Sequence, residues 1–268
     1  MRNAGLLFLL AICLFACEDK EEAAFEAFEN EDFEQSLVIF KELSSLDPQN
    51  WYHLYNIARS LEELGRYNEA ITWYGKSLRY NEKANEILIA RARCLLRTDY
   101  LDGAKTDLFR VLQRDEENFE ANYLMGRVMM ADNDPWSALS YYNKAIKKDD
   151  SDVTLFYHRA IVMGTVGNGY MALRDINHVI SQKPDFNQAY FNRGILQMRA
   201  GKYAEAIEDF DRAEALAYAP ADLYVRRADC KSSVGLNSAA CTDYKIASDM
   251  DPKHYKKVFL EMCAVSSN

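Results

Sequence analysis

Residues of three kinds return every 34 positions along this chain, and this period constrains the fold more than any other feature of the sequence. A first set is made of small residues: Ala24, Ala58, Ala92, Gly126, Ala160, Gly194 and Ala228. A second small set is Ser36, Ala70, Ala104, Ala138, Ala172, Ala206 and Ala240. The third set is large and apolar or aromatic: Phe40, Tyr74, Leu108, Tyr142, Ile176, Phe210 and Tyr244. All three sets stay in phase over seven units without insertion or deletion, so one structural element is repeated.

Each unit has the pattern of two amphipathic helices joined by a turn. The clearest copy is Asn187–Pro220, where Gly194 lies in the first helix, Gly201 at the turn and Phe210 in the second helix. Small residues let the two helices approach closely, and the aromatic ring fills the space between them. Such a pair cannot bury its apolar face alone, so we expect neighbouring pairs to stack into one continuous core.

Two further sets mark the turns and the ends of the units. Glycine occupies the turn at Gly65, Gly167, Gly201 and Gly235, and proline closes three units at Pro48, Pro184 and Pro252. With these marks the pattern resembles the tetratricopeptide repeat family over Cys17–His254, although Glu82, Glu116, Asp150 and Tyr218 replace the closing proline elsewhere. The resemblance implies an all-α fold: a right-handed α-solenoid of about seven helix-turn-helix repeats plus a C-terminal capping helix.

The period also sets the boundaries that we expect. They are a signal peptide at 1–16, an acidic tether and weak repeat 1 at 17–50, repeats 2 to 7 at 51–84, 85–118, 119–152, 153–186, 187–220 and 221–254, and a capping helix with a tail at 255–268. Repeat positions below are counted from the first residue of each unit. The capping helix is expected to place Tyr255, Val258, Phe259, Met262 and Cys263 on its apolar side.

The N-terminus has the pattern of an export signal. A short positive lead is followed by the apolar run Ala4–Phe15, which is too short for a permanent membrane helix but suits a signal peptide. Leu14–Cys17 resembles a bacterial lipobox, which implies that Cys17 is acylated and anchors the mature chain in a membrane. An ordinary signal peptide with an incidental cysteine is the alternative.

The negative charge is concentrated behind that cysteine. Glu18–Glu34 carries nine acidic residues against Lys20 alone, whereas the whole chain has a net charge of −9. This segment resembles the surface-export tag of Bacteroidota-type lipoproteins, and a solvated stalk that holds the repeats away from the membrane is an equal alternative. The acidic balance also argues against nucleic acid as a partner.

Charged residues inside the repeats fall into two linked sets. Position 7 holds Arg91, Arg159, Arg193 and Arg227, and position 23 of the same four repeats holds Asp107, Asp175, Asp209 and Asp243. Repeats with an apolar residue at position 7 have an apolar or aromatic residue at position 23. An unpaired arginine would be costly in a packing position, so we expect a partly buried ion pair between the two helices of each of these repeats.

The concave groove of such a superhelix is lined by the first helices of the repeats. Candidate partner-binding residues on that face are Tyr55, Asn56, Arg59, Arg93, Tyr123, Arg127, Tyr157, His158, Phe191 and Asn192. Arginine and tyrosine are enriched at binding surfaces, and arginine grips carboxylates with a planar fork. Packing between neighbouring side chains is the alternative reading of these aromatic residues.

No set of residues has the spacing of a catalytic or metal site, and no cofactor is expected. The four histidines are scattered, and Gly164–Gly169 lies at a repeat turn rather than after a strand. Among the cysteines, Cys230 and Cys241 lie on the two helices of one repeat and could approach, but buried free thiols are expected.

We therefore expect a non-enzymatic scaffold or assembly factor. It would be lipid-anchored in a bacterial cell envelope, with the outer membrane as the expected membrane, and would bind other envelope proteins through an acidic or aromatic segment. A glycan or cell-wall accessory to an envelope enzyme is the alternative.

Overall fold

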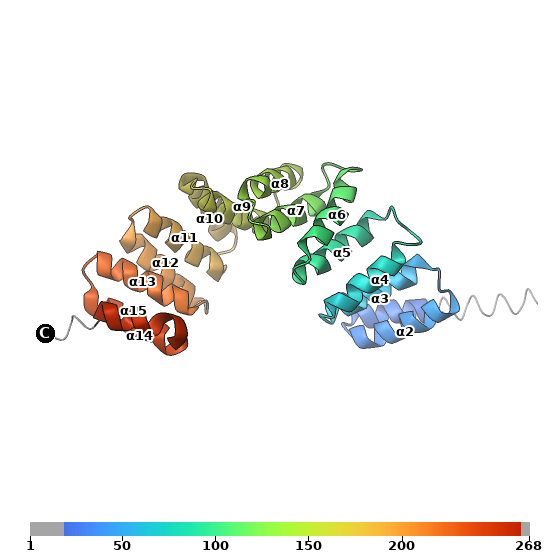
Figure 1. Cartoon of the computed structure of the whole chain (residues 1–268), viewed down its shortest axis with the longest axis horizontal. Helices are drawn as coiled ribbons and strands as arrows, with labels where there is room; N and C mark the ends of the chain where they lie inside the picture. Colours follow the sequence, from blue (N-terminus) through green and yellow to red (C-terminus); the bar gives the residue numbers. More distant parts are fainter. Residues whose placement is uncertain (1–18, 264–268) are drawn as a thin grey trace, which may run out of the picture. The chain divides into compact units, whose positions relative to one another are not determined.

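The computed structural model of the chain describes residues 19–263, which contain helices and turns and no strand. The chain divides into two compact units, Met1–Asp134 and Pro135–Asn268, here called unit 1 and unit 2. The division falls inside the expected repeat at 119–152. Figure 1 labels the helices of both units.

Unit 1 begins with helical residues 19–29. The helices that follow are α2 (Phe33–Leu46), α3 (Trp51–Glu63), α4 (Tyr67–Ser77), α5 (Asn85–Arg97), α6 (Leu101–Leu112) and α7 (Phe119–Ala131). Unit 2 contains α8 (Pro135–Lys148), α9 (Val153–Thr165), α10 (Gly169–Gln182), α11 (Asn187–Arg199), α12 (Tyr203–Ala215), α13 (Ala221–Ser233), α14 (Asn237–Met250) and α15 (Pro252–Cys263).

Within each unit, every helix packs against the next helix in the chain (Figure 1). The first helices of neighbouring repeats also touch: α3 contacts α5, α5 contacts α7, α9 contacts α11, and α11 contacts α13. This stacking of consecutive helix pairs confirms the expected all-α solenoid. It also places the first helices side by side, and we call the surface that they form the first-helix face of each unit.

Polar residues start several of these helices. The side chain of Asn50 accepts hydrogen bonds from the backbone of α3, Asn118 does the same for α7, and Asp152 for α9. These contacts satisfy backbone N–H groups that have no partner inside a helix. They fix where each first helix begins, and therefore the register in which neighbouring first helices meet.

The turn between the two helices of a repeat has one backbone conformation throughout. The four turn glycines have φ between 72° and 83°. In the repeats without a turn glycine, Glu31, Asp99 and Asn133 occupy the same position with φ of 62°, 63° and 59°. The left-handed conformation is thus set by the repeat, and glycine is the residue that adopts it without steric cost.

The small and large periodic sets form the core, as their spacing predicts. Ala206, Phe210 and Ala213 are fully buried in unit 2, and Tyr74 is fully buried in unit 1. A Cβ atom added to Gly194 would lie 2.8 Å from a ring carbon of Phe210. A larger residue at 194 would therefore push the two helices of this repeat apart.

Repeat 1 is better formed than the expected acidic tether. Residues 19–29 are helical, and Ala24 is fully buried. The Phe25 ring packs against Phe40 and Tyr52, with centroids 5.2 and 5.9 Å away. The acidic residues from Asp19 onward thus belong to a folded helix pair, because apolar residues interleaved among them anchor the helix to α2 and α3.

The last helix covers the end of unit 2. Val258, Phe259 and Cys263 pack against the buried Ala228, Ala240 and Tyr244. Leu260 and Met262 remain about half exposed, and no residue of α15 is fully buried. The expected capping helix is present, but it begins at Pro252, and Met262 does not join its packed side.

Candidate functional site

The four arginine–aspartate pairs that we expected are formed, each between the two helices of one repeat. In every pair, Nε and Nη2 of the arginine donate to the two carboxylate oxygens of the aspartate. The closest distances are 2.7 Å for Arg91–Asp107, 2.6 Å for Arg159–Asp175, 2.6 Å for Arg193–Asp209 and 2.8 Å for Arg227–Asp243. The aspartate side chains are at most 5% exposed. This fork geometry is specific to arginine and carboxylate.

Aromatic rings complete the surroundings of three of these arginines. The guanidinium of Arg193 lies 5.5 Å from the centre of the Tyr190 ring, and that of Arg227 lies 5.3 Å from the Tyr224 ring. The hydrogen bond with Asp209 raises the pKa of Arg193 above its ordinary value. These arginines are therefore held within the repeat and are occupied by intramolecular contacts.

Each arginine in unit 2 also reaches the preceding repeat, through residues that the sequence analysis missed. Arg159 donates to Asn143 at 3.0 Å, Arg193 to Asn177 at 2.8 Å, and Arg227 to Asp211 at 2.6 Å. All three acceptors stand at repeat position 25, which is 16 residues before the arginine. The signal was present in the sequence, since each acceptor carries a side-chain oxygen. The arginines thus join neighbouring repeats as well as the helices of one repeat.

The three expected partner-binding arginines of unit 1 have different side-chain partners. Arg93 donates to Glu62 at 2.8 Å and to Glu120 at 2.7 Å, so it links α3, α5 and α7. Arg59 stacks 4.4 Å above the Phe28 ring and donates to Asn56. Arg127 lies 5.9 Å from the centre of the Tyr123 ring. Arg93 is consequently an internal bridge.

Among the described residues, no carboxylate forms an ion pair with Arg59 or with Arg127. Both cations therefore remain able to meet an external carboxylate. Their partly exposed neighbours Tyr55 and Tyr123 lie on the same face. Burial raises the pKa of Tyr55, so its hydroxyl is neutral near pH 7 and serves as a hydrogen-bonding group.

Several other candidate residues offer little surface to a partner. Asn56 is 1% exposed, and its side chain donates to the backbone oxygen of Tyr52. Phe191 belongs to the core, where its ring lies 5.3 Å from that of Tyr218. Tyr157 is also buried, and burial raises its pKa to about 12. The expectation that these three residues face a partner is corrected: helix packing covers them.

Position 6 in unit 2 carries polar residues that are only partly covered. His158 is partly buried, and its ring stacks on that of Tyr142 at 6.0 Å between centroids. Asn192 is also partly buried, and its amide donates to the Tyr157 hydroxyl and to the Gln188 backbone oxygen, both at 2.9 Å. Asn192 is the candidate residue that lies at a cavity.

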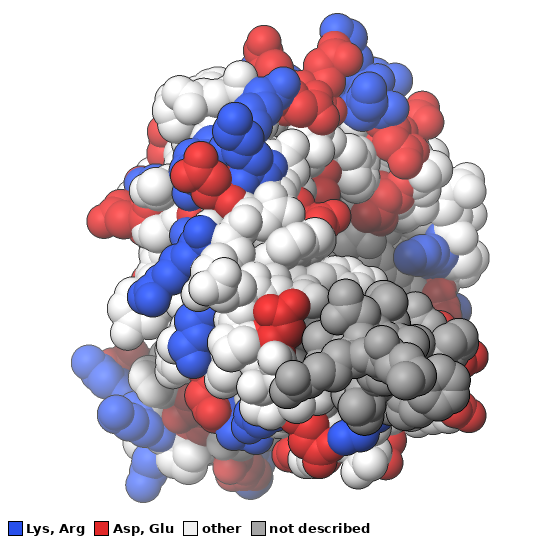
Figure 2. Space-filling model, turned by 90° about the vertical axis from the view of Figure 1, so that its right-hand side faces the viewer, with Lys and Arg blue, Asp and Glu red and all other residues white. Residues whose placement is uncertain are grey.

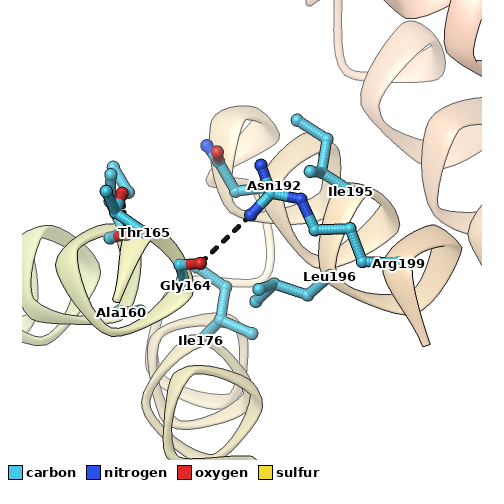
Figure 3. Close-up of a pocket in the computed structure, with 9 residues that line it drawn as sticks. Ala160, Gly164, Thr165, Ile176, Asn192, Ile195, Leu196 and Arg199 are labelled. Carbon is cyan, nitrogen blue, oxygen red and sulfur yellow. Dashed lines mark hydrogen bonds between the residues drawn. The ribbon is translucent and has the colours of Figure 1, made fainter. Parts of the chain in front are cut away.

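That cavity opens between α9 and α11 on the first-helix face of unit 2 (Figure 3). It has a volume of about 110 Å³, and its apolar lining is Ala160, Ile161, Ile176, Ile195 and Leu196. Gly164, Thr165, Asn192 and Arg199 complete the lining. Figure 3 shows Arg199 reaching over the cavity to the Gly164 backbone oxygen, which accepts a hydrogen bond at 3.1 Å. The cavity combines an apolar floor with a cationic rim.

The expected buried free thiol is confirmed for Cys230 and is wrong for Cys241. Cys241 of α14 forms a disulfide with Cys263 of α15, with 5.6 Å between their Cα atoms. Cys94 and Cys230 are free and buried, and burial raises the pKa of Cys230 to about 11. Cys230 turns into the core of its repeat, whereas α15 folds back beside α14 and brings Cys263 to Cys241. Sequence spacing alone could not show this, because Cys263 matches the apolar side of the last helix.

Acidic and basic side chains share the surface. On the face shown in Figure 2, acidic and basic side chains both occur, and uncharged residues cover much of the surface between them. Within residues 19–263, no helix is long and apolar enough to cross a membrane, and no cluster of three His, Cys, Asp or Glu side chains could hold a metal ion. The expected signal peptide and Cys17 lie outside the described residues.

Repeat models from known proteins match two parts of the chain. Residues 26–81 and 55–112 match one model described as Tetratricopeptide repeat, and residues 188–219 match another with the same description. The DnaJ homolog subfamily C member 3 of Rattus norvegicus is 33% identical over 93 residues, which cover 35% of this chain and 18% of that protein. The chain thus spans less than a fifth of the length of the first curated relatives that it matches.

Solved structures extend the likeness to nearly the whole chain. A tetratricopeptide repeat protein from Parabacteroides merdae has a TM-score of 0.69 and 24% identity, over 94% of this chain and 99% of that one. YrrB, described as a TPR protein with an unusual peptide-binding site, has a TM-score of 0.56 and 20% identity, over 66% of this chain and 91% of that one. At these identities the likeness establishes the fold.

Proposed function

We propose that this chain, whose residues 26–112 and 188–219 match tetratricopeptide repeat models, is a protein-binding scaffold or assembly factor anchored in a bacterial cell envelope. One observation carries the binding function. On the first-helix faces of the described units, Arg59, Arg127 and Arg199 form no ion pair with a carboxylate of residues 19–263, whereas Arg93 has two such partners. Arg59 and Arg127 are partly exposed and lie beside Tyr55 and Tyr123, so they are suited to bind an acidic or aromatic segment of another protein.

The description of YrrB as a peptide-binding TPR protein supports this proposal by analogy of fold. The envelope proteins that this chain would bind are a class inferred from its export signal. An enzymatic activity is not part of this proposal.

Crosslinking in the native cell tests the binding function. A photo-reactive residue at Tyr52, which is exposed on α3, should capture a defined partner protein in the wild-type chain. The charge reversals Arg59→Glu and Arg127→Glu together should abolish capture while the helical circular dichroism stays unchanged. Arg66→Glu is the matched control, because Arg66 pairs with Glu69 away from this face. Unchanged capture by the double variant would show that another surface binds.

The anchor is a separate part of the proposal. The Leu14–Cys17 motif supports acylation of Cys17, and the Cys241–Cys263 disulfide supports export, since disulfides persist in oxidising compartments. The Cys17→Ser variant should lose its acyl chains, detected by mass spectrometry, and should move from the membrane fraction to the soluble fraction. An ordinary signal peptide predicts instead that this substitution changes neither the mass beyond the residue itself nor the fractionation.

The helical residues 19–29 bear on how far the proposed anchor would hold the repeats from the membrane. Glu18 alone separates Cys17 from the first described helical residue, Asp19. A long solvated stalk is therefore disfavoured, and an acylated Cys17 would hold repeat 1 close to the membrane. The acidic residues of this helix are suited to recognition by an export pathway. Replacing Glu21 and Glu22 with glutamine should then reduce cell-surface exposure, measured by protease shaving of intact cells, without releasing the chain from the membrane.

A glycan accessory function finds little support. Sugar rings bind against exposed aromatic faces, but Tyr157 and Phe191 on the first-helix face of unit 2 are each only 8% exposed. Pull-down of the purified chain by insoluble cell wall, with no captured protein, would reverse this preference.

A further inference from the structure

Two repeat positions meet at two junctions of neighbouring first helices in unit 1. At both junctions, position 12 of one first helix contacts position 9 of the next. In unit 1, Glu62 at position 12 accepts a hydrogen bond from Arg93 at position 9, and Phe28 at position 12 lies under the guanidinium of Arg59 at position 9. Side chains fill the junction between first helices in both cases.

Unit 2 breaks this pattern at the junction of α9 and α11. Position 12 of α9 is Gly164, which has no side chain, and position 9 of α11 is Ile195. The cavity lies at this junction, and both residues line it. A Cβ atom at 164 would lie 3.0 Å from Cδ2 of Leu196, so the glycine also keeps the floor of the cavity in place. The missing side chain produces the hollow.

The size of the hollow restricts what it can hold. Its volume of about 110 Å³ is well below the roughly 300–1,000 Å³ of pockets that bind drug-sized ligands. It is closer to the roughly 150 Å³ of an apolar cavity that holds one benzene molecule. Three isoleucines and a leucine form the apolar part of its lining, and polar atoms of Thr165, Asn192 and Arg199 lie beside them. A single aliphatic side chain matches both its volume and its chemistry.

The rim adds a charge requirement. Arg199 is exposed, and one N–H of its guanidinium donates a hydrogen bond to the Gly164 backbone oxygen. No carboxylate of residues 19–263 forms an ion pair with it. Figure 3 shows Asn192 next to this guanidinium at the same edge of the cavity. A ligand group beside the buried side chain would therefore meet a cation with free donors, which favours a carboxylate.

We propose that this cavity binds one aliphatic side chain of an extended partner segment, and that an acidic residue next to it pairs with Arg199. This rests on the proposed protein-binding function and names the chemistry that one subsite recognises. The occupant is a leucine-like residue followed by aspartate or glutamate. An aliphatic residue followed by a basic one would be rejected, because its cation would face Arg199.

The test uses the full mature chain and the probe N-acetyl-Leu-Asp-amide, followed by NMR of the isoleucine methyl groups. Saturable shifts should appear at Ile161, Ile176 and Ile195. N-acetyl-Ala-Asp-amide should bind about tenfold more weakly or worse, because it lacks most of the apolar side chain. N-acetyl-Leu-Lys-amide should bind about threefold to fivefold more weakly, because an exposed charge contact carries about that factor. Equal binding of the three probes, or no saturable shift with the first, would overturn the proposal.

Two variants test the apolar lining of the cavity and the charge at its rim separately. Gly164→Met should fill the cavity and abolish binding of the leucine probe, and Gly169→Met is the control, because nothing lies within 4 Å of a Cβ at Gly169. Arg199→Gln should remove the preference for the aspartate probe over the lysine probe while the methyl shifts persist. If Gly164→Met also lowers the melting temperature, its loss of binding can result from unfolding, and the Arg199→Gln variant alone then tests the proposal. Undiminished aspartate preference in that variant rejects the proposal.

Failure of the subsite and failure of the scaffold function have different signatures. If the wild-type chain and Gly164→Met capture the same partner in cells, the subsite is rejected and the scaffold function stands. If the wild-type chain captures no partner, the scaffold function itself fails.

Discussion

Removing Asp209 should destabilise unit 2 more than any surface substitution in it. Its carboxylate accepts bonds of 2.8 and 2.6 Å from Arg193, and the side chains of Asp209 and Arg193 are only 5% and 23% exposed. Asp209→Ala leaves a largely buried guanidinium with only Asn177 as a polar partner. Breaking a buried pair costs about 3–5 kcal/mol, and we expect about 3 kcal/mol here because Arg193 keeps some contact with water.

A double-mutant cycle separates this penalty from the net value of the pair. Arg193→Met with Asp209→Leu removes both charges and should cost about 1 kcal/mol or less, since apolar residues of similar volume replace a buried ion pair well. Asp249→Ala is the matched control: Asp249 pairs with Lys245 at 2.8 Å, but their side chains are 66% and 62% exposed. This control should cost less than about 1 kcal/mol.

The assay must resolve single repeats, because long repeat arrays do not always unfold in one step. Urea unfolding followed by circular dichroism gives the free energy of unfolding. Amide hydrogen exchange of α11 and α12 shows whether the loss is local to this repeat. Single-mutant losses that simply add in the double variant would refute the buried clamp, and so would equal losses for Asp209→Ala and the exposed control.

Three further predictions follow from particular contacts. Gly167→Ala should destabilise the chain by about 1 kcal/mol in thermal unfolding because φ at 167 is 83°, whereas Gly169→Ala, which is equally free of neighbours but helical, should be neutral or stabilising. Cys263→Ser should lower the stability of α15 by about 3 kcal/mol, seen as faster amide exchange in that helix, and unchanged exchange would contradict the model of a latched cap. Partial burial opposes the charge of Glu214, but hydrogen bonds from Arg227 and Tyr224 lower its pKa, so its contribution to stability is present above the ordinary glutamate pKa and is lost as the pH falls through the lowered value. Between pH 6 and pH 3, the melting temperature of Glu214→Gln should therefore fall less than that of the wild type, and an equal fall would show that this carboxylate does not matter.

The features that the sequence predicts well are those in which one position dictates another. Arg193 at position 7 requires a partner if it is buried, and Asp209 recurs with it at position 23, so the ion pair could be inferred without coordinates. The turn is a similar case, because Gly201 marks a left-handed conformation. That conformation belongs to the repeat rather than to the residue, so Asp99 adopts it as well.

Features that depend on contacts between repeats were harder to predict. Arg59 and Arg93 share position 9, yet their surroundings differ because Phe28 stands at position 12 before one and Glu62 before the other. Phe191 was predicted to face a partner because its helical spacing alone does not distinguish exposed from packed positions. Tyr218, beyond the end of α12, covers its ring, and the 34-residue period contains no information about that contact.

The variation at position 12 connects these observations to function. A repeat stack needs its periodic small and aromatic residues to hold the helices together, so those positions have little freedom to vary. Position 12 lies at the junction of first helices, where an ion pair, an aromatic contact or an empty space are all compatible with the same backbone. Unit 1 uses Glu62 to close one junction with Arg93, and unit 2 leaves a hollow at Gly164 with Arg199 at its rim. The two junctions differ at position 12, where Gly164 replaces Glu62, and at position 9, where Ile195 replaces Arg93. A few substitutions at these two positions thus exchange a structural ion pair for a hollow, while the periodic core residues that hold the solenoid stay the same.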